Sequence, residues 1–222
     1  MSGTVVVVDD DQSVGKALSR LLQVKGYGAR VFRSAEECLP SLETVRGPAC
    51  VIADLVLPGI SGSELQARLP FNIPFIMLTG DADVPTTVST MLAGAIELLE
   101  KPVAEAPLLA AVERALAVSA QRNIERDIKS ALSQKASRLT PRELEVMAMV
   151  TTGLRNKEVA NFLGIVEKTV KVHRANIMHK LEIDSLAEMV RCADRLEIRY
   201  THQEASPPRK RSEPCQHGFS AD

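Results

Sequence analysis

Short apolar runs recur through the first half of this chain, and they limit its possible folds more than any other feature. The first run, Val5–Val8, is apolar at every position instead of at every second position. Such a run is typical of a strand that is buried on both faces of a parallel sheet. Including this one, strand-like runs predict strands at residues 4–8, 28–32, 49–53, 73–78 and 95–99.

The segments between these runs carry helix patterns. Residues 12–22 place apolar side chains on one face, and Ser34 and Ser61 each precede a glutamate by three residues, the spacing of a capping box. Further helices are predicted at Val84–Leu92 and from Glu105 onward. Because strands that alternate with helices form right-handed β-α-β units, the first half is predicted to be α/β, a doubly wound five-stranded parallel sheet.

The second half contains helical patterns and no convincing strand. A small all-α domain is predicted, with helices at Thr140–Thr152, Asn156–Leu163, Val166–Leu181 and Ser185–Ile198. From Thr201 the sequence is polar and aperiodic, and disorder is expected there. The predicted divisions are a first domain over residues 3–120, a helical linker over 121–135, a second domain over 136–200 and a tail over 201–222.

The connecting segment has its own pattern. A helix is predicted from about Pro107 through Leu132. Its apolar residues Ile124, Ile128 and Leu132 recur every four residues, with Glu125 and Lys129 as a supporting ion pair. The stripe makes a dimer seam possible, although it is too short to define a coiled coil.

Composition restricts the class of protein. The chain is 45% apolar and 25% charged, as ordinary soluble proteins are, and no apolar run approaches the roughly 20 residues of a membrane span. No basic segment precedes the apolar N-terminal run, so no secretory signal is predicted. The cysteines lack paired or metal-type spacing, so reduced thiols and a cytoplasmic location are expected; they are Cys38, Cys50, Cys192 and Cys215.

Charge is distributed unevenly between the two halves. Acidic residues outnumber basic ones over residues 1–120, and basic residues outnumber acidic ones over residues 121–222. This asymmetry suggests domains with different partners, the second of which could be a polyanion.

Polar residues follow the predicted strands directly. They are Asp9, Asp10 and Asp11 after the first strand, Asp54 after the third, Thr79 at the end of the fourth and Lys101 after the fifth. Because the carboxyl ends of parallel strands share one edge of a sheet, these side chains are expected to converge. Carboxylates about 4 Å apart repel by about 1 kcal/mol in water and by more inside a protein, unless a cation lies among them.

Mg²⁺ is the cation that suits such a set, because it takes carboxylate oxygens together with water and phosphate oxygens. Asp9, Asp10 and Asp54 are therefore predicted Mg²⁺ ligands, and an aspartate could accept a phosphoryl group. Thr79 and Lys101 would then hold the phosphoryl oxygens.

Plainer roles remain open for the same residues. Asp54 could cap the following turn, Asp11 could be a solvated helix-start residue, and Thr79 could be an ordinary turn residue. A phosphatase that forms an aspartyl-phosphate commonly needs a second acid two residues after its nucleophile, and that position here is Val56. The site is therefore expected to capture phosphate and release it slowly, and the protein is not expected to be an enzyme.

The set DD…ADLVLPGISG…MLTG…EKP resembles the receiver domain of two-component response regulators, over about residues 3–120. The resemblance implies a flavodoxin-like fold in which Asp54 accepts phosphate from a sensor histidine kinase. It implies Mg²⁺ ligands from Asp9, Asp10, Asp54 and the main-chain carbonyl of Val56, with Thr79 as the switch hydroxyl and Lys101 as the phosphate-binding lysine before a cis Pro102. Leu98 stands where the family often has an aromatic residue, which keeps a phosphate-independent receiver as an alternative.

In the second half, residues 156–175 form two predicted helices around Gly164, which suits a tight turn. In a helix-turn-helix motif the second helix enters the major groove of DNA. Val166, Val170, Ile177 and Leu181 of that helix are predicted to pack inward. A helical protein-interaction domain is the alternative.

The run LTPRE…NKEVA…TVKVHRANIMHKL resembles the LuxR-type DNA-binding domain. With a receiver in front, the chain resembles the NarL/FixJ group, and FixJ in particular. The resemblance implies groove-facing positions for Lys171, Val172 and Ala175, with base recognition resting more on Lys171 and Asn176. Phosphate contacts are implied for Lys168, Thr169 and Arg174.

These expectations describe a cytoplasmic regulator of transcription that does not bind a membrane. Phosphorylation of Asp54, with Mg²⁺ as cofactor, would promote a homodimer that binds double-stranded promoter DNA. Activation of transcription, with RNA polymerase as a possible partner, is expected from the habit of the family. The alternative is a phosphate-independent receiver that serves as a protein-interaction module on a DNA-binding protein.

Overall fold

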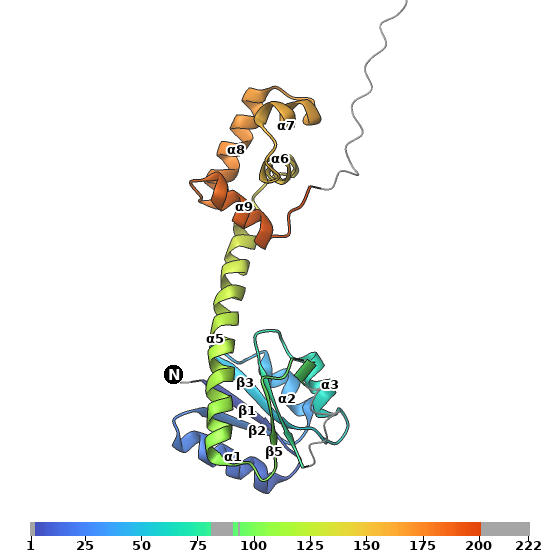
Figure 1. The fold of residues 1–222 in the computed structure, drawn as a ribbon, viewed down its shortest axis with the longest axis vertical. Helices are drawn as coiled ribbons and strands as arrows, with labels where there is room; N and C mark the ends of the chain where they lie inside the picture. The colour runs from blue at the N-terminus through green and yellow to red at the C-terminus, as the bar shows by residue number, and fades with distance from the viewer. Residues whose placement is uncertain (1–2, 81–90, 93, 201–222) are drawn as a thin grey trace, which may run out of the picture. The chain divides into compact units, whose positions relative to one another are not determined.

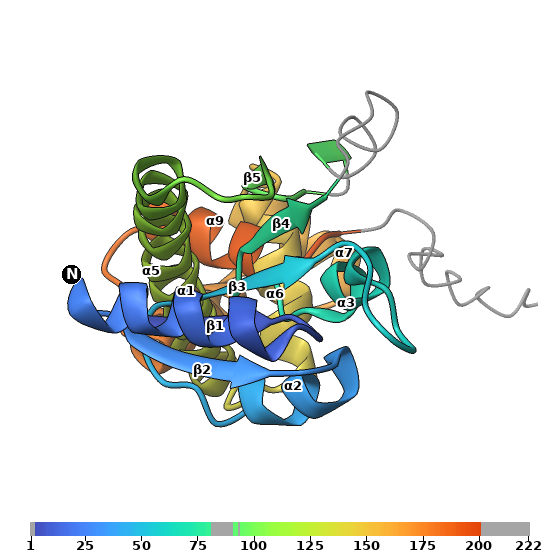
Figure 2. The same ribbon diagram turned by 90° about the horizontal axis from the view of Figure 1, so that it is seen from below.

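The computed structural model describes residues 3–80, 91–92 and 94–200. Contacts divide the chain into two compact units, Met1–Asp127 and Ile128–Asp222. Each unit has its own hydrophobic core, and the elements of both are shown in Figures 1 and 2. The predicted tail from Thr201 and all but the last two residues of the predicted helix Val84–Leu92 lie outside the described residues.

A five-stranded parallel sheet forms the centre of the first unit, with the strand order β2-β1-β3-β4-β5 (Figure 2). The strands are β1 (Thr4–Val8), β2 (Gly28–Phe32), β3 (Ala49–Asp54), β4 (Phe75–Thr79) and β5 (Glu97–Glu100). Val5–Val8 are fully buried, because β1 lies between β2 and β3 with helices over both faces. The predicted doubly wound sheet is confirmed.

Two strands begin later than predicted. β4 begins at Phe75 instead of residue 73, because the Ile73 N–H bonds to the Pro70 carbonyl in a turn (2.8 Å) and Pro74 has no N–H to donate. β5 begins at Glu97 instead of residue 95. The apolar residues at the start of a run do not reveal where strand pairing starts.

The helices of the first unit divide between the two faces of the sheet (Figure 1). Over residues 3–80 and 94–127 they are α1 (Gln12–Val24), α2 (Ala35–Leu42), α3 (Gly62–Arg68) and the first part of α5 (Glu105–Ala136). Residues of α1 and α5 pack against Val5 and Val7, whereas residues of α2 and α3 pack against Val6 and Val8. The alternation of side chains along β1 thus supplies both cores.

Side chains cap the first three helices. Ser61 and Glu64 form the predicted capping box at the start of α3. At the start of α2 the box is incomplete: Ser34 accepts the Glu37 N–H, but the Glu37 carboxylate accepts the N–H of Arg33 instead of that of Ser34. Asp11 is the N-cap of α1 and accepts hydrogen bonds from the backbone and hydroxyl of Ser13.

Helix α5 runs from the first unit into the second. The buried Ser119 hydroxyl accepts the Ala49 N–H (3.0 Å) and donates to the Asn72 carbonyl (2.8 Å), which ties the helix to the sheet. Farther along the helix, Leu132 belongs to the core of the second unit. The predicted pair between Glu125 and Lys129 is wrong, since Lys129 pairs instead with Glu197 (3.0 Å).

The apolar stripe predicted along α5 is interrupted by a change in burial. Ile124 and Ile128 are 55% and 41% exposed, whereas Leu132 is buried. The three residues do not form one continuous exposed face.

Four helices follow in the described part of the second unit: α6 (Pro141–Thr151), α7 (Asn156–Leu163), α8 (Glu167–Leu181) and α9 (Leu186–Arg195). The predicted capping box of Thr140 and Glu143 is present, and Gly164 ends α7 with a φ of 63°. Val170, Ile177 and Leu181 are buried as predicted. The inward packing predicted for Val166 is wrong: this residue is the N-cap of α8, outside the helix, and it is 66% exposed.

The described cysteines are all free. Burial raises the pKa of the thiols of Cys38 and Cys50 to about 12, so both are protonated and unreactive at neutral pH. Cys215 lies outside the described residues. Within the described part of the chain, no helix has the length and apolarity that crossing a membrane requires.

Candidate functional site

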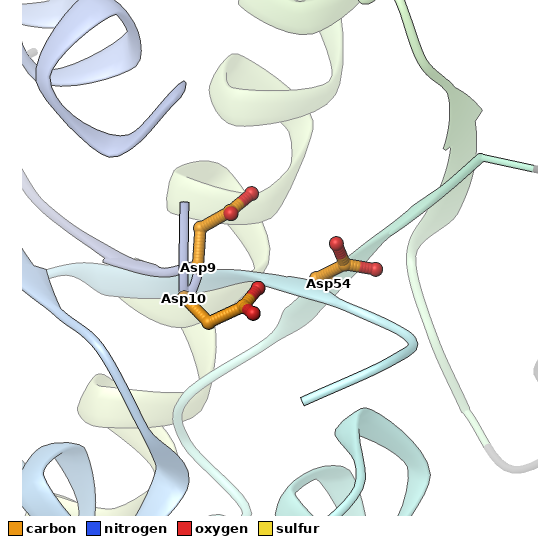
Figure 3. Close-up of side chains that lie close together, drawn as sticks. All are labelled: Asp9, Asp10 and Asp54. Atoms are coloured by element: carbon orange, nitrogen blue, oxygen red, sulfur yellow. The ribbon is translucent and has the colours of Figure 1, made fainter. Parts of the chain in front are cut away.

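Three aspartates gather at the carboxyl edge of the sheet. Asp9 and Asp10 follow β1, and Asp54 ends β3, the neighbouring strand (Figure 3). One carboxylate oxygen of each residue lies within 4.8 Å of those of the other two. Strand order reverses between β1 and β3, and this switch point is where sheets of this kind bind their ligands.

A lysine joins two of these carboxylates. The Lys101 ammonium lies 2.7 Å from Asp9 Oδ2 and 2.6 Å from Asp54 Oδ2. Burial acts to lower the pKa of Lys101, but the hydrogen bonds to Asp54 and Asp9 outweigh it and hold the pKa above its usual value. The lysine therefore stays charged and offsets part of the repulsion between the aspartates.

The backbone around the aspartates is also fixed. Asp9 is buried (1% exposed), and its Oδ1 accepts the Asp11 N–H (2.9 Å). Asp54 Oδ1 accepts the Val56 N–H (3.0 Å). Asp10 is exposed, so the cluster has one side open to solvent.

The donor set fits Mg²⁺. All three side chains offer carboxylate oxygens, the ligand type that Mg²⁺ takes in proteins. The exposed side of the cluster leaves room for the remaining ligands of Mg²⁺, which are normally water molecules and the phosphate oxygens of a substrate. Asp11 is not part of this group, because its carboxylate caps α1.

The remaining predicted residues lie around the same edge. Thr79 ends β4 and is buried, and its carbonyl accepts the Lys101 N–H (2.7 Å). The peptide bond between Lys101 and Pro102 is cis, as the resemblance implied. Leu98 is on β5 and partly buried against the core on the α2 and α3 face, so an aliphatic side chain occupies the position often held by an aromatic one.

The second unit presents a different kind of site, on the surface of α8. The exposed residues of this helix include most of those predicted to contact DNA: Lys168, Lys171, Val172, Ala175 and Asn176. Their spacing of three and four residues places them on one face, opposite the buried Val170 and Ile177. Such a face can enter a major groove.

The other predicted contacts are less accessible. Thr169 and Arg174 are half-buried, and the Arg174 guanidinium donates to Asn156 Oδ1 (2.8 Å) at the start of α7. The sequence pattern missed this bond. A guanidinium has five N–H donors, so one bond to Asn156 leaves others for a phosphate.

A buried ion pair was also missed. The Glu143 carboxylate, 3% exposed as a residue, accepts the Lys180 ammonium (2.6 Å) and the Thr140 N–H (2.7 Å). It joins the first turn of α6 to the last turn of α8. The capping-box pattern in the sequence predicted only the bond between Glu143 and Thr140.

The fold and these two sites define a class: a receiver domain followed by a helix-turn-helix DNA-binding domain. Residues 5–113 match the response regulator receiver domain family, and residues 137–193 match the bacterial regulatory proteins of the luxR family. The chain belongs to the two-component response regulators of the NarL/FixJ group and is FixJ-like.

Named relatives cover nearly the whole chain. Nodulation protein W of Bradyrhizobium diazoefficiens is 39% identical over 204 residues, covering 90% of this chain and 89% of that protein. The transcriptional regulatory protein FixJ of Rhizobium meliloti is 39% identical over 197 residues, covering 86% of this chain and 94% of that protein. The family is one of transcriptional regulators and not of enzymes.

Solved structures agree with this assignment. The response regulator StyR is 43% identical, with a TM-score of 0.68 over 87% of this chain and 99% of that one. Full-length FixJ from B. japonicum is 34% identical, with a TM-score of 0.52 over 88% of this chain and 98% of that one. A receiver domain implies a kinase as phosphodonor, and a LuxR-type domain implies DNA as a partner.

Proposed function

We propose that Asp54 accepts a phosphoryl group from a sensor histidine kinase, and that the phosphorylated protein binds promoter DNA as a dimer. An oxygen of Asp54 would attack the phosphorus, the bond from phosphorus to the kinase histidine nitrogen would break, and the nitrogen would keep the electron pair. The observation that supports this most directly is that Asp54 and Asp9 share the Lys101 ammonium beside Asp10.

Each neighbour has a role in this proposal. Asp9, Asp10, Asp54 and the Val56 carbonyl would hold Mg²⁺, which neutralises charge on the incoming phosphoryl group. Lys101 and the Thr79 hydroxyl would bind phosphoryl oxygens once the bond to Asp54 has formed. Because Lys101 begins beside Asp54 at 2.6 Å, little movement is needed.

The DNA-binding unit would act through the exposed face of α8. Lys168 and Lys171 would supply charge that neutralises DNA phosphates. Val172, Ala175 and Asn176 continue the same exposed face of the helix toward its C-terminal end. A dimer would place two such helices on half-sites about one helical turn apart. We propose that the complex activates transcription in the cytoplasm by contacting RNA polymerase.

Phosphorylation is tested with the full chain and a small acyl phosphate as phosphodonor, with and without Mg²⁺. We expect Mg²⁺-dependent labelling of the wild type and none of Asp54→Asn. Beryllofluoride, which mimics a phosphoryl group, should increase the dimer fraction and the affinity for DNA. Labelling that persists in Asp54→Asn contradicts the proposed acceptor, and unchanged assembly with beryllofluoride favours the phosphate-independent alternative.

DNA contact is tested by footprinting with Lys171→Ala. Loss of a lysine that contacts a guanine should weaken specific binding by about 1–3 kcal/mol. Lys16→Ala removes an exposed lysine from α1 and serves as the matched control. Equal footprints for the wild type and Lys171→Ala would remove α8 from the proposed interface.

A further inference from the structure

The loop between β3 and α3, residues 55–61, leads directly away from Asp54 and contains Val56, whose carbonyl is a proposed Mg²⁺ ligand. Its two ends are held by hydrogen bonds, one to the Asp54 side chain and one within the backbone. The Val56 N–H bonds to Asp54 Oδ1 (3.0 Å), and the Gly62 N–H bonds to the Leu55 carbonyl (3.1 Å). Any side chain at Gly62 would clash with the Asp54 carbonyl, so α3 must begin very close to the end of β3.

The far part of the loop is held from a different element. Glu36, in the first turn of α2, accepts the Ile60 N–H on its Oε1 (3.1 Å). Gly59 has a φ of 75°, and a Cβ there would lie 2.5 Å from the same Oε1. Gly59 therefore allows both the turn and the close approach of the carboxylate.

This carboxylate is ionised at neutral pH. Hydrogen bonds from its own backbone N–H and, to a lesser degree, from Ile60 lower the pKa of Glu36, and Arg68 on α3 adds a favourable charge. The bond to Ile60 is charge-assisted and correspondingly stronger than a neutral one.

The adjacent Glu37 provides a natural comparison. It is exposed like Glu36, lies in the same first turn and also accepts one backbone N–H from outside the helix, that of Arg33 (3.2 Å). Arg33 precedes α2, whereas Ile60 belongs to the loop after Asp54. The two glutamates thus differ in the segment they bind: Glu37 binds the residues just before α2, whereas Glu36 binds the loop after Asp54.

We infer that Glu36 is a positioning residue, which fixes the loop after Asp54 so that the Val56 carbonyl faces the aspartate cluster and Mg²⁺ binds more tightly. The inference rests on the proposed function. Glu36 touches neither the metal nor the phosphoryl group. It acts through Ile60 and Gly59 on the segment that carries Val56.

The test is calorimetric titration of the full-length chain with MgCl₂, without phosphodonor. Loss of one hydrogen bond in Glu36→Ala should weaken Mg²⁺ binding about fivefold, the equivalent of about 1 kcal/mol. Glu36→Gln keeps an acceptor oxygen but loses the charge, and it should recover part of the affinity. Glu37→Ala should bind Mg²⁺ as the wild type does.

A second measurement is independent of the metal. In Glu36→Ala, and not in Glu37→Ala, amide hydrogen exchange at Ile60 should accelerate in Mg²⁺-free buffer while exchange in β1 and β3 stays unchanged. Equal Mg²⁺ affinities for the two alanine variants would overturn the inference and leave the proposed function intact. If the wild type bound no Mg²⁺ and Asp54→Asn lost no labelling, the proposed function itself would fail, and the inference with it.

Discussion

The two units use charge in opposite ways. In the receiver, Asp9, Asp54 and Lys101 lie at one edge of the sheet, where the side chains are 0%, 15% and 23% exposed. On α8 the charges are spread along a face, and the side chain of Lys171 is 64% exposed. Under the proposed function, burial would hold the first set in the geometry that metal and phosphate chemistry require, while exposure would let the second set exchange counterions for DNA phosphates.

The ion pairs also divide into buried and exposed ones, and each unit contains both kinds. Lys101 and Lys180 each bond to a buried carboxylate, whereas the pair of Lys171 with Glu167 (3.2 Å) is exposed on both sides. Removing one partner of a buried pair leaves an uncompensated charge and is costly, whereas exposed pairs contribute little. The contrast is tested by removing one member from each pair.

The largest effect is expected for Lys101→Met. Without the ammonium, Asp9 and Asp54 face each other without compensation, and the receiver should lose about 3 kcal/mol of its free energy of unfolding. Saturating Mg²⁺ should restore most of the loss, because the metal takes the place of the ammonium among the carboxylates. Hydrogen exchange in β1 and β3, with and without Mg²⁺, measures both effects.

Lys25→Met is the control for Lys101→Met. The pair of Lys25 with Glu105 (2.7 Å) is about half exposed on both sides, so its loss should cost about 0.5 kcal/mol or less, with no response to Mg²⁺. If Mg²⁺ failed to restore the stability of Lys101→Met, the ammonium and the metal would not share a site.

A smaller effect is expected for Lys180→Met in the second unit. Glu143 would remain buried without its cation, but Lys180 is itself 30% exposed, so the loss should be about 2 kcal/mol. Burial acts to raise the pKa of Glu143, yet Lys180 and Thr140 outweigh it and keep the pKa below 4.5. Since the folded pKa lies below the unfolded one, this stabilisation is present above about pH 4.5 and is lost as the pH falls further.

The test is the free energy of unfolding in urea between pH 3 and pH 7, followed through amide hydrogen exchange in α6 and α8. The wild type and Lys180→Met should differ most at neutral pH and converge in acid. A difference that stayed constant with pH would mean that Lys180 stabilises the unit by packing alone.

The aspartate cluster of the receiver was predictable from sequence because strand geometry does most of the positioning. Once Val5–Val8 and residues 49–53 are recognised as neighbouring parallel strands, Asp9, Asp10 and Asp54 must emerge at the same edge. Their convergence required no knowledge of side-chain conformations. The start of β4 was not predictable in this way, because Pro74 and the turn at Ile73 interrupt the pairing inside an apolar run.

Hydrogen bonds between residues that are distant in the sequence had no comparable pattern. Glu36 with Ile60, Lys180 with Glu143 and Arg174 with Asn156 join residues that are 18 to 37 positions apart. No helical or strand period relates them, and each polar residue alone is compatible with simple solvation. Helix periodicity correctly predicted that Val170, Ile177 and Leu181 of α8 are buried, but it wrongly placed Val166 inside, because an N-cap residue lies outside the repeat.

The smallest effect on stability is expected for Glu167→Gln, which removes the exposed partner of Lys171. The loss should be at most about 0.5 kcal/mol, since this is a solvent-screened pair four residues apart on one helix. Affinity for DNA should instead increase severalfold on any sequence, because a carboxylate beside the phosphates is removed and Lys171 is released. Binding isotherms at several salt concentrations measure this, with Glu145→Gln of the exposed pair on α6 as the control. If Glu167→Gln weakened binding to one sequence only, Glu167 would be accepting a hydrogen bond from a cytosine, and the charges of α8 would be as precisely placed as those of the receiver.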